Sequence, residues 1–472
     1  MRRLLPSLLL AAAVTAAGCG PAPPGESAEQ EDDPYLWLEE VDGERALAWV
    51  EERNAATAAR LAGTPLFEEL LGQARAVLDS HSRLPRVTQR AGWLYNFWRD
   101  ETNPRGLYRR TTLAGLRSDQ PDWQTVLDVD ALAESEGEKW VFKGMSCLPE
   151  EYRHCLVFLS PGGGDAVTVR EFDMETLEFV SDGFALPLAK SRVSWRDRDT
   201  LFVGTDFGDG SMTESGYPRI VKLWRRGEPL TAAETLLEGA SASVSVRGDR
   251  YFTDDGEIDL VTEATTFWRA VRHHLLDGAL HRLALPETAV VADAYRGRLL
   301  VELKEPWTVA GATHPAGSLV LVAPDSLHPG AAPEVEPLVR PDWGTVVEDA
   351  EATPEGILVT LLDDVRGRLH RYREDGDGWR RETIPFPDNG ALSVTSVDAE
   401  DGSFFVQYQS FTTPPTLYYV AGPGWQPQAI LAQDPTFDGS RFLVEQHFAT
   451  SADGTLVPYF EVRPREAALD GG

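Results

Sequence analysis

The sequence predicts a mainly β fold, a seven-bladed β-propeller preceded by two short helices, and two observations lead to it. Between about residues 92 and 430, a short apolar strand, a polar or glycine-rich turn and a second, alternating strand recur seven times. Short runs of apolar, β-branched and aromatic residues that end at turn residues are typical of strands. A repeat of roughly 45 to 60 residues is typical of propellers and solenoids. A ring of such units buries faces that a single unit leaves exposed.

The seven apolar strands and their partners follow each other in step along the chain. The apolar strands are residues 92–95, 155–158, 201–203, 250–252, 299–301, 357–359 and 404–406. Their partners are residues 106–109, 167–170, 219–223, 279–283, 318–321, 368–372 and 416–419. We therefore assign residues 81–440 to the propeller.

Residues 1–18 have the layout of an export signal. Arg2 and Arg3 precede an apolar run over residues 4–17, which is too short to span a membrane well, and small residues follow. Cys19 comes after Ala-Ala-Gly, an arrangement similar to a bacterial lipobox. We expect lipidation at Cys19 and a membrane-anchored lipoprotein of the bacterial cell envelope. Ordinary signal cleavage near Ala17, which would give a periplasmic protein, is the alternative.

Residues 19–33 are rich in proline, glycine and acidic residues and predict a disordered tether. Residues 34–80 predict a helical segment instead. Its second helix begins at Thr64 and Pro65, the residue types favoured at the N-cap and in the first turn. Both helices carry apolar stripes, and these faces need a partner, either another domain or the flank of the propeller. The stripes are Leu47, Trp49, Val50 and Leu61, and Leu66, Leu70, Ala74, Val77 and Leu78.

Charge and cysteine content narrow the range of partners and compartments. Lys and Arg number 44 against 75 Asp and Glu, a net charge of −31 that repels phosphate backbones and argues against nucleic acid. Cys147 and Cys155 are the cysteines that remain after Cys19. In an oxidising compartment they are positioned to form a disulfide. Two independent buried thiols are the alternative, because Cys155 opens an apolar strand.

Two segments resemble catalytic or binding motifs but have simpler explanations. Residues 160–165, Ser-Pro-Gly-Gly-Gly-Asp, join two strands and lack the Lys-Ser/Thr of a phosphate loop, which favours a β-turn. Ser211 and Ser215 lie in the long polar loop of residues 204–218. Because no base is placed beside either serine, we interpret this segment as a solvated loop that shapes an inter-domain face.

Histidine and acidic clusters lead to similar conclusions. The spacing of His273, His274 and His281 fits neither a zinc-binding helix nor a facial triad, so we expect no metal site, and we expect no cofactor. Six carboxylates could in principle pair for glycoside hydrolysis, but solvation of turns and loops explains them. They are Asp254, Asp255, Glu257, Asp259, Asp363 and Asp364.

Several segments, taken together and in this order, resemble the prolyl oligopeptidase family of serine peptidases, specifically its propeller-containing N-terminal part. The first reads Tyr35-Leu-Trp-Leu-Glu-Glu-Val-Asp-Gly-Glu-Arg45, with Asn54 beyond it. The likeness covers nearly everything between residues 35 and 464. The other segments are residues 97–107 with 109–111, 204–230, 410–417 and 445–458.

The resemblance implies a two-domain enzyme in which an α/β-hydrolase domain carries a Ser, Asp and His triad. The propeller caps that domain and restricts access to short peptides, and the best-known members cleave after proline. The resemblance also implies that the N-terminal helices pack against the hydrolase domain and that residues 441–472 begin it. No serine in the chain has glycine both two before and two after it, as a G-x-S-x-G elbow requires. We therefore expect no catalytic residue in this chain.

The sequence thus predicts the gating part of an exported, prolyl-oligopeptidase-like serine peptidase that acts on peptides. Its catalytic hydrolase domain would be supplied in cis or by a split partner, and this chain alone would be inactive. A stand-alone propeller lipoprotein that binds a peptide or protein without catalysis is the alternative. A third hypothesis, a propeller glycosidase, requires carboxylates that converge at the centre of the ring.

Overall fold

The structure, a computed structural model, describes residues 33–78, 83–118, 120–149, 151–376 and 378–467. The expected signal segment, Cys19 and nearly all of the tether lie outside these residues. The chain divides into two compact units, Met1–Asp79 and Ser80–Gly472.

The first unit consists of helices with little buried surface of their own. A short 3-10 helix, η1 (Leu36–Glu39), precedes α1 (Glu44–Leu61) and α2 (Pro65–Leu78). The hydroxyl of Thr64 accepts a hydrogen bond from the Phe67 N–H at 3.2 Å, so Thr64 caps α2 as the sequence indicates. Leu47 on α1 is 49% exposed and Leu70 on α2 is 53% exposed, so each helix leaves apolar side chains uncovered.

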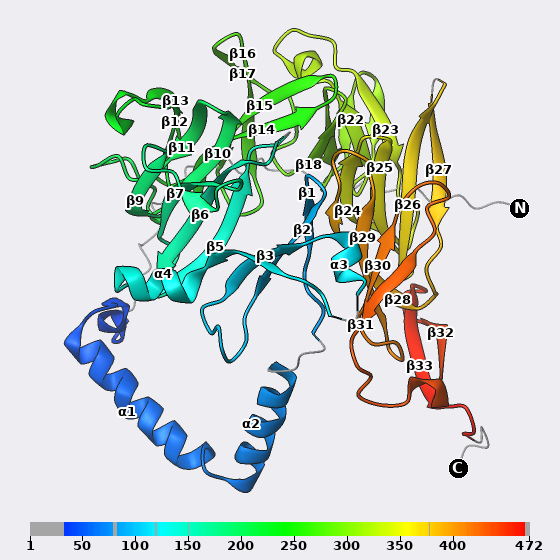
Figure 1. Cartoon of the computed structure of the whole chain (residues 1–472). Helices are drawn as coiled ribbons and strands as arrows, with labels where there is room; N and C mark the ends of the chain where they lie inside the picture. Colours follow the sequence, from blue (N-terminus) through cyan, green and yellow to red (C-terminus); the bar gives the residue numbers. More distant parts are fainter. Residues whose placement is uncertain (1–32, 79–82, 119, 150, 377, 468–472) are drawn as a thin grey trace, which may run out of the picture. The chain divides into compact units, whose positions relative to one another are not determined.

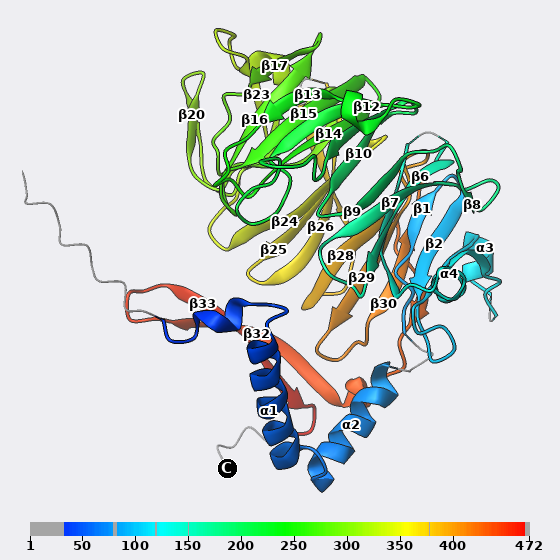
Figure 2. The same ribbon diagram turned by 90° about the vertical axis from the view of Figure 1, so that its left-hand side faces the viewer.

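Among the described residues, the second unit contains seven antiparallel sheets of four or five strands, which are the seven blades of a propeller (Figures 1 and 2). Blade 1 comprises β1 (Thr88–Arg90), β2 (Trp93–Trp98), β3 (Leu107–Thr111) and β4 (Gln124–Asp128). Blade 2 comprises β5 (Trp140–Cys147), β6 (His154–Pro161), β7 (Val167–Asp173) and β8 (Glu178–Phe179), with β9 (Ala185–Ala189) also paired to β7. Helices α3 (Leu113–Leu116) and α4 (Val129–Glu136) flank β4.

Blades 3 to 5 continue the pattern around the ring. Blade 3 comprises β10 (Arg192–Asp197), β11 (Thr200–Gly204), β12 (Ile220–Arg225) and, after η2 (Leu230–Ala232), β13 (Glu234–Glu238). Blade 4 comprises β14 (Ser245–Thr253), β15 (Gly256–Ala264), β16 (Ala270–Leu276) and β17 (Ala279–Arg282). Blade 5 comprises β18 (Val290–Tyr295), β19 (Arg298–Glu302), β22 (Leu319–Val322) and β23 (Val335–Val339). It has two insertions, a small hairpin formed by β20 (Trp307–Val309) and β21 (Ala312–His314), and the 3-10 helix η3 (Pro324–Leu327).

Blades 6 and 7 complete the ring. Blade 6 comprises β24 (Thr345–Thr353), β25 (Gly356–Asp363), β26 (Arg366–Asp375) and β27 (Gly378–Ile384). Blade 7 comprises β28 (Gly390–Val397), β29 (Phe404–Ser410), β30 (Thr416–Val420) and β31 (Gln428–Ala432). After η4 (Gly439–Arg441), the chain forms a two-stranded hairpin, β32 (Phe442–Thr450) and β33 (Leu456–Pro464). That this hairpin begins a hydrolase domain stays a prediction.

The predicted strand pairs are the second and third strands of six blades, where the structure pairs them as expected. In blade 4 the prediction is wrong, because residues 250–252 belong to the first strand and residues 279–282 to the fourth. The true second strand, β15, contains Asp259, whose charge made the sequence look like a turn. Asp259 is 5% exposed and its carboxylate is paired with Arg250 at 2.6 Å and with Arg196 of blade 3 at 2.8 Å.

Except in blade 4, whose β15 contains Asp259, the second strand of a blade carries an apolar run because neighbouring blades cover both of its faces. In β11, Leu201 and Val203 join one cluster with blade 2, whereas Phe202 joins another with blade 4, and all three are 0% exposed. Fully burying such a side chain contributes about 2 to 3 kcal/mol. A continuous apolar run, rather than an alternating one, is therefore the expected sequence of this strand.

The ring closes between blades 1 and 7 without a shared strand, since each of these blades is built from four consecutive strands. The Gln89 backbone N–H donates to the Ser396 hydroxyl at 2.7 Å, and its side-chain amide donates to the Ser403 carbonyl at 2.9 Å. An apolar cluster that includes Leu94 and Phe405 fills the same seam. Hydrogen bonds between side chains and backbone groups, together with this apolar cluster, thus link the first and last blades.

Candidate functional site

The alternating strand directions give the propeller two distinct faces. The distal face carries the turns that join first to second strands, and the proximal face carries the turns that join second to third strands together with the connections between blades. β1 begins and β31 ends at the proximal face, so both flanking segments leave from it. The hairpin β32–β33 also contacts this face: the Asn389 side chain donates to the Val444 carbonyl at 3.5 Å, and the Phe411 and Phe460 rings lie 5.1 Å apart.

On the distal face, turns from five blades converge on a cavity of about 330 Å³. Its walls combine aromatic rings, Tyr152, Phe252 and Tyr295, with charged groups. The charged groups are three carboxylates and one guanidinium, Asp254, Glu257, Glu400 and Arg296. Arg296 is already paired with Glu374 at 2.6 Å, so the mouth of the cavity is electronegative and suits a cationic or amino-terminal group of a ligand.

A disulfide closes one of the turns that line this cavity. Cys147 and Cys155 face each other as the last pair of β5 and β6, and their sulfur atoms are bonded. The turn that they close contributes Pro149 and Tyr152 to the cavity wall. The disulfide therefore restrains the position of the Tyr152 ring.

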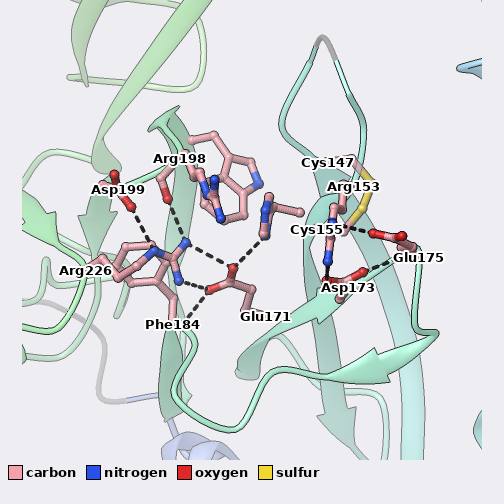
Figure 3. A network of polar contacts seen from close by, with 12 residues as sticks. Cys147, Arg153, Cys155, Glu171, Asp173, Glu175, Phe184, Arg198, Asp199 and Arg226 are labelled. Carbon is pink, nitrogen blue, oxygen red and sulfur yellow. Dashed lines mark hydrogen bonds and ion pairs between the residues drawn. A yellow bond between two sulfur atoms is a disulfide. The ribbon is translucent and has the colours of Figure 1, made fainter.

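A buried carboxylate fixes blade 2 against blade 3 close to this turn (Figure 3). Glu171 is 1% exposed and accepts from Arg226 at 2.8 and 3.0 Å and from the Phe184 N–H at 2.9 Å. Its other neighbour is the imidazole of His154, at 3.2 Å. A buried carboxylate is tolerated only with such partners, so this cluster links the two blades firmly.

A second group of acidic residues lies on β18 and β24, the first strands of blades 5 and 6, which are in contact with each other. Asp293 accepts from the backbone N–H groups of Ala294 and of Ala352, both at 2.8 Å, and its burial raises its pKa. Burial, with the nearby charges of Asp349 and Asp293, raises the pKa of Glu351 to about 7. Since Asp293 is held by backbone groups, it ties two blades together and is not free to act on a ligand.

The six carboxylates singled out in the sequence have separate places. Asp254 and Glu257 line the distal cavity, Asp255 lies beside Asp254 in the turn between β14 and β15, and Asp259 is buried in its ion pairs. Asp363 and Asp364 lie at the turn between β25 and β26, on the proximal face. Sequence reasoning missed Asp293, Asp349 and Glu351. The signal available was the pair Asp349 and Glu351 in β24, because residues two apart in a strand point to the same face of the sheet.

The loop of residues 204–218 on the proximal face is solvated only in part: Glu214 and Ser215 are exposed, as the sequence predicts, whereas Ser211 is buried. Ser211 is 2% exposed, donates to the Gly208 carbonyl at 2.6 Å and accepts from the Phe207 N–H at 2.9 Å. Thr213 is 6% exposed and also bonded within the loop. The glycines allow the backbone to fold over its own polar groups, so Ser211 and Thr213 shape the loop from inside, whereas Ser215 faces solvent.

The large apolar side chains that the propeller exposes gather on the proximal face. This holds for each large hydrophobic residue that is more than one third exposed among the described residues of blades 1 to 7 and their connections. These residues lie in turns between second and third strands, in connections between blades, in the strand ends beside them, or in the segment after β31. Phe267 and Trp268, at the tip between β15 and β16, are 86% and 85% exposed. The others are Leu188, Val290, Trp343, Val346, Val365, Phe411 and Phe437.

Comparisons with known proteins agree on one family. Residues 25–422 match the profile of the prolyl oligopeptidase N-terminal beta-propeller domain. An uncharacterized peptidase of Sinorhizobium fredii is 34% identical over 459 residues, which are 95% of this chain and 63% of that protein. An uncharacterized peptidase of Rickettsia prowazekii is 25% identical over 452 residues, 92% of this chain and 62% of that protein.

Solved structures give the same fold. A post-proline cleaving enzyme from Rickettsia typhi superposes with a TM-score of 0.83 at 24% identity, over 91% of this chain and 65% of that one. Oligopeptidase B from Leishmania major superposes with a TM-score of 0.68 at 15% identity, over 93% of this chain and 61% of that one. The chain thus spans less than two thirds of the length of these proteins.

Within the part of the chain that the structure describes, no helix combines the length and the apolar character needed to cross a membrane.

Proposed function

Because this chain belongs to the prolyl oligopeptidase family, whose N-terminal β-propeller domain it forms, we propose that it is the gating part of a serine peptidase acting on peptides. In this proposal the propeller covers an α/β-hydrolase domain that carries the nucleophile, and this chain contributes no catalytic residue of its own. The domain is supplied in cis or by a separate chain.

One observation carries the proposal: the exposed apolar side chains of the ring lie on the proximal face, from which both flanking segments also leave. A surface that exposes several large apolar groups, Trp268 and Phe411 among them, is typical of a face that another domain covers. The exposed apolar residues of α1, α2 and the β32–β33 hairpin support the same partner. Leu70 and Val457, for example, are 53% and 48% exposed.

The distal cavity supports the second part of the proposal, selection of the substrate. An acidic, partly aromatic opening bounded by short turns admits an extended chain end and favours a cationic terminus. A cavity of about 330 Å³ is too small to hold a folded protein. Short peptides are therefore the substrate class that we propose, with access limited by the blades.

Export and lipidation at Cys19 are a further part of the proposal. The residues before Cys19 have the layout of a signal peptide, and the Cys147–Cys155 disulfide suits an oxidising compartment. Mass spectrometry of the mature N-terminus tests this part. A diacylated Cys19 is expected, and an unmodified start at another residue would exclude the lipoprotein.

The gating role is tested by supplying the missing partner. The purified chain, alone and mixed with the part of the Sinorhizobium fredii relative that it does not match, is given a proline-containing chromogenic peptide and a fluorophosphonate probe. We expect no labelling and no turnover from this chain alone, and we expect the mixture to discriminate against long peptides more strongly than the added part alone. Labelling of any serine in this chain refutes the proposal. If the two parts do not associate at all, the stand-alone binding propeller is the better account.

A further inference from the structure

Side chains of two neighbouring blades meet at the boundary between blades 4 and 5, away from the distal cavity. His274 comes from β16, and Asp325 and His328 come from the segment that begins with η3. The His274 Nδ1 lies 3.1 Å from the His328 Nε2 and 3.1 Å from the Asp325 Oδ1, and the last two atoms are 3.9 Å apart. Two imidazole nitrogens and one carboxylate oxygen therefore converge on one point.

The three groups are held in place from both blades. His274 is 6% exposed, and its cross-strand neighbour His281 stacks on the His328 ring with centroids 4.4 Å apart. Leu327, the residue before His328, is 0% exposed, and its carbonyl accepts from the Ala284 N–H just beyond β17 at 3.0 Å. The geometry of the cluster is thus set by the packing of the propeller itself.

A hydrogen bond from His274 can satisfy only one of its two close neighbours at a time. The Nδ1 of His274 has at most one proton, yet it faces both the nitrogen of His328 and the oxygen of Asp325. Ligand atoms about 2.0 to 2.1 Å from a tetrahedral zinc ion lie about 3.3 Å apart, within the range of the three distances here.

We propose that His274, Asp325 and His328 form a binding site for a divalent transition metal ion, Zn²⁺ above all, that clamps blade 4 to blade 5. Two nitrogen ligands and one oxygen ligand suit zinc and its neighbours in the first transition row. The Asp325 side chain is 68% exposed, which leaves room for water as a fourth ligand. The proposed site is independent of the peptidase assignment.

A second group of similar composition provides a matched control. Glu445, His447 and Glu461 on the hairpin also bring their ligand atoms together. Arg463, however, lies 3.0 Å from Glu445 and 3.3 Å from Glu461. Because its guanidinium is paired with both carboxylates and competes with a metal ion for their oxygens, we expect no metal at His447.

The test is zinc binding by the tag-free chain after removal of metal with a chelator. We expect one equivalent of Zn²⁺ to bind, and we expect Asp325→Asn and His328→Gln to weaken binding at least about 100-fold, the upper end of the loss when a group supporting a metal ligand is removed. His447→Gln should bind like the unaltered chain. No zinc binding by the unaltered chain at about 100 μM, where most metalloprotein sites are filled, or equal binding by the Asp325→Asn chain, would overturn the proposal.

Thermal unfolding provides a second readout that does not depend on counting metal. Because a ligand of the folded state raises the unfolding temperature, zinc should raise Tm for the unaltered chain and for His447→Gln, but not for Asp325→Asn. Equal Tm values of the variants in chelator show that each has folded. Zinc binding without a rise in Tm contradicts a clamp made by the packed blades.

Discussion

The proximal and distal faces of the propeller are built from the same seven blades yet differ in what they expose. The proximal face presents large apolar side chains such as Phe267, Trp268 and Phe411. The distal face presents short polar turns around an acidic cavity, in which the rings of Tyr152 and Tyr295 are covered or partly covered. Because the blades already have complete apolar cores, the exposed apolar groups are not needed to fold the ring.

The difference indicates which face meets water and which meets a partner. Surface apolar groups confined to the face from which both flanking segments leave are best explained by a domain that covers them. The distal face then stays open to solvent and substrates.

The largest effect is expected from the aromatic tip of the proximal face. Replacing Phe267 and Trp268 together by serine should weaken association with the complementary part of the Sinorhizobium fredii relative by about 2 to 4 kcal/mol, as loss of interface aromatic anchors does. The free energy of unfolding of the chain alone should change little, because both side chains are exposed. Titration calorimetry and urea unfolding measure the two quantities. Asp255→Ser, on a distal turn, is the control and should leave association unchanged.

The next effect concerns the rigidity of the distal face. Arg226→Met leaves the carboxylate of Glu171 buried without its main partner, so we expect unfolding to become easier by about 3 kcal/mol. Arg153→Met removes a more exposed ion pair with Asp173 in the same region and should have little effect (Figure 3). Urea unfolding of both variants checks the order. Equal losses would mean that the buried link between blades 2 and 3 does not stabilise the ring.

A smaller effect depends on pH. The pKa of Glu351 is about 7 in the folded chain, above its ordinary value of 4.5, so the protonated form stabilises the fold. This contribution is complete below about pH 4.5 and is lost as the pH rises to about 7. Glu351→Gln should therefore raise Tm more at pH 8 than at pH 5. The corresponding gain in the free energy of unfolding at pH 8 is at most about 3 kcal/mol.

Glu348→Gln, a change at an exposed carboxylate of the same strand, is the control for this prediction. Its Tm should follow that of the unaltered chain at both pH values. A Glu351→Gln chain with the same pH dependence as the unaltered chain contradicts the assignment.

The smallest effect belongs to the acidic mouth. Changing Asp254, Glu257 and Glu400 to their amides should raise KM for peptides with a cationic N-terminus only a few-fold in the assembled enzyme, because exposed charges are strongly screened. The difference should vanish in about 1 M salt, where the Debye length is about 3 Å. A neutral, N-acetylated peptide is the control and should show no change.

The sequence was sufficient to predict the ring but not the contacts that bring distant residues together. Apolar second strands such as residues 299–301 were recognised because both of their faces are covered, and the cap at Thr64 was recognised from local chemistry. Blade 4 was misread because Asp259 is buried in a strand by arginines from two blades. Nothing in the local pattern reveals a compensating charge on another blade.

The same limit applies to the sites. His274 looked unremarkable beside His273 because its true neighbours, Asp325 and His328, are about fifty residues away and arrive through the next blade. The pKa of Glu351 is raised mainly by its burial, with smaller contributions from Asp349 on the same strand and Asp293 on another. Ser211 was expected in water but lies under its own loop. Spacing along the chain detects neighbours on one strand, whereas His274 and Glu351 gain their partners from an adjacent blade and Ser211 from the folding of its own loop.

Hydrogen exchange of the chain, alone and with the complementary part of the Sinorhizobium fredii relative, tests the central claim most directly. The account predicts slower exchange on binding at the proximal face, in residues 265–269 and 410–415, and in α1, α2 and the β32–β33 hairpin. The distal turns, residues 151–155 and 253–257, should exchange at unchanged rates. Slower exchange confined to the distal turns, or none anywhere on the proximal face, would contradict a propeller that covers a catalytic domain with that face.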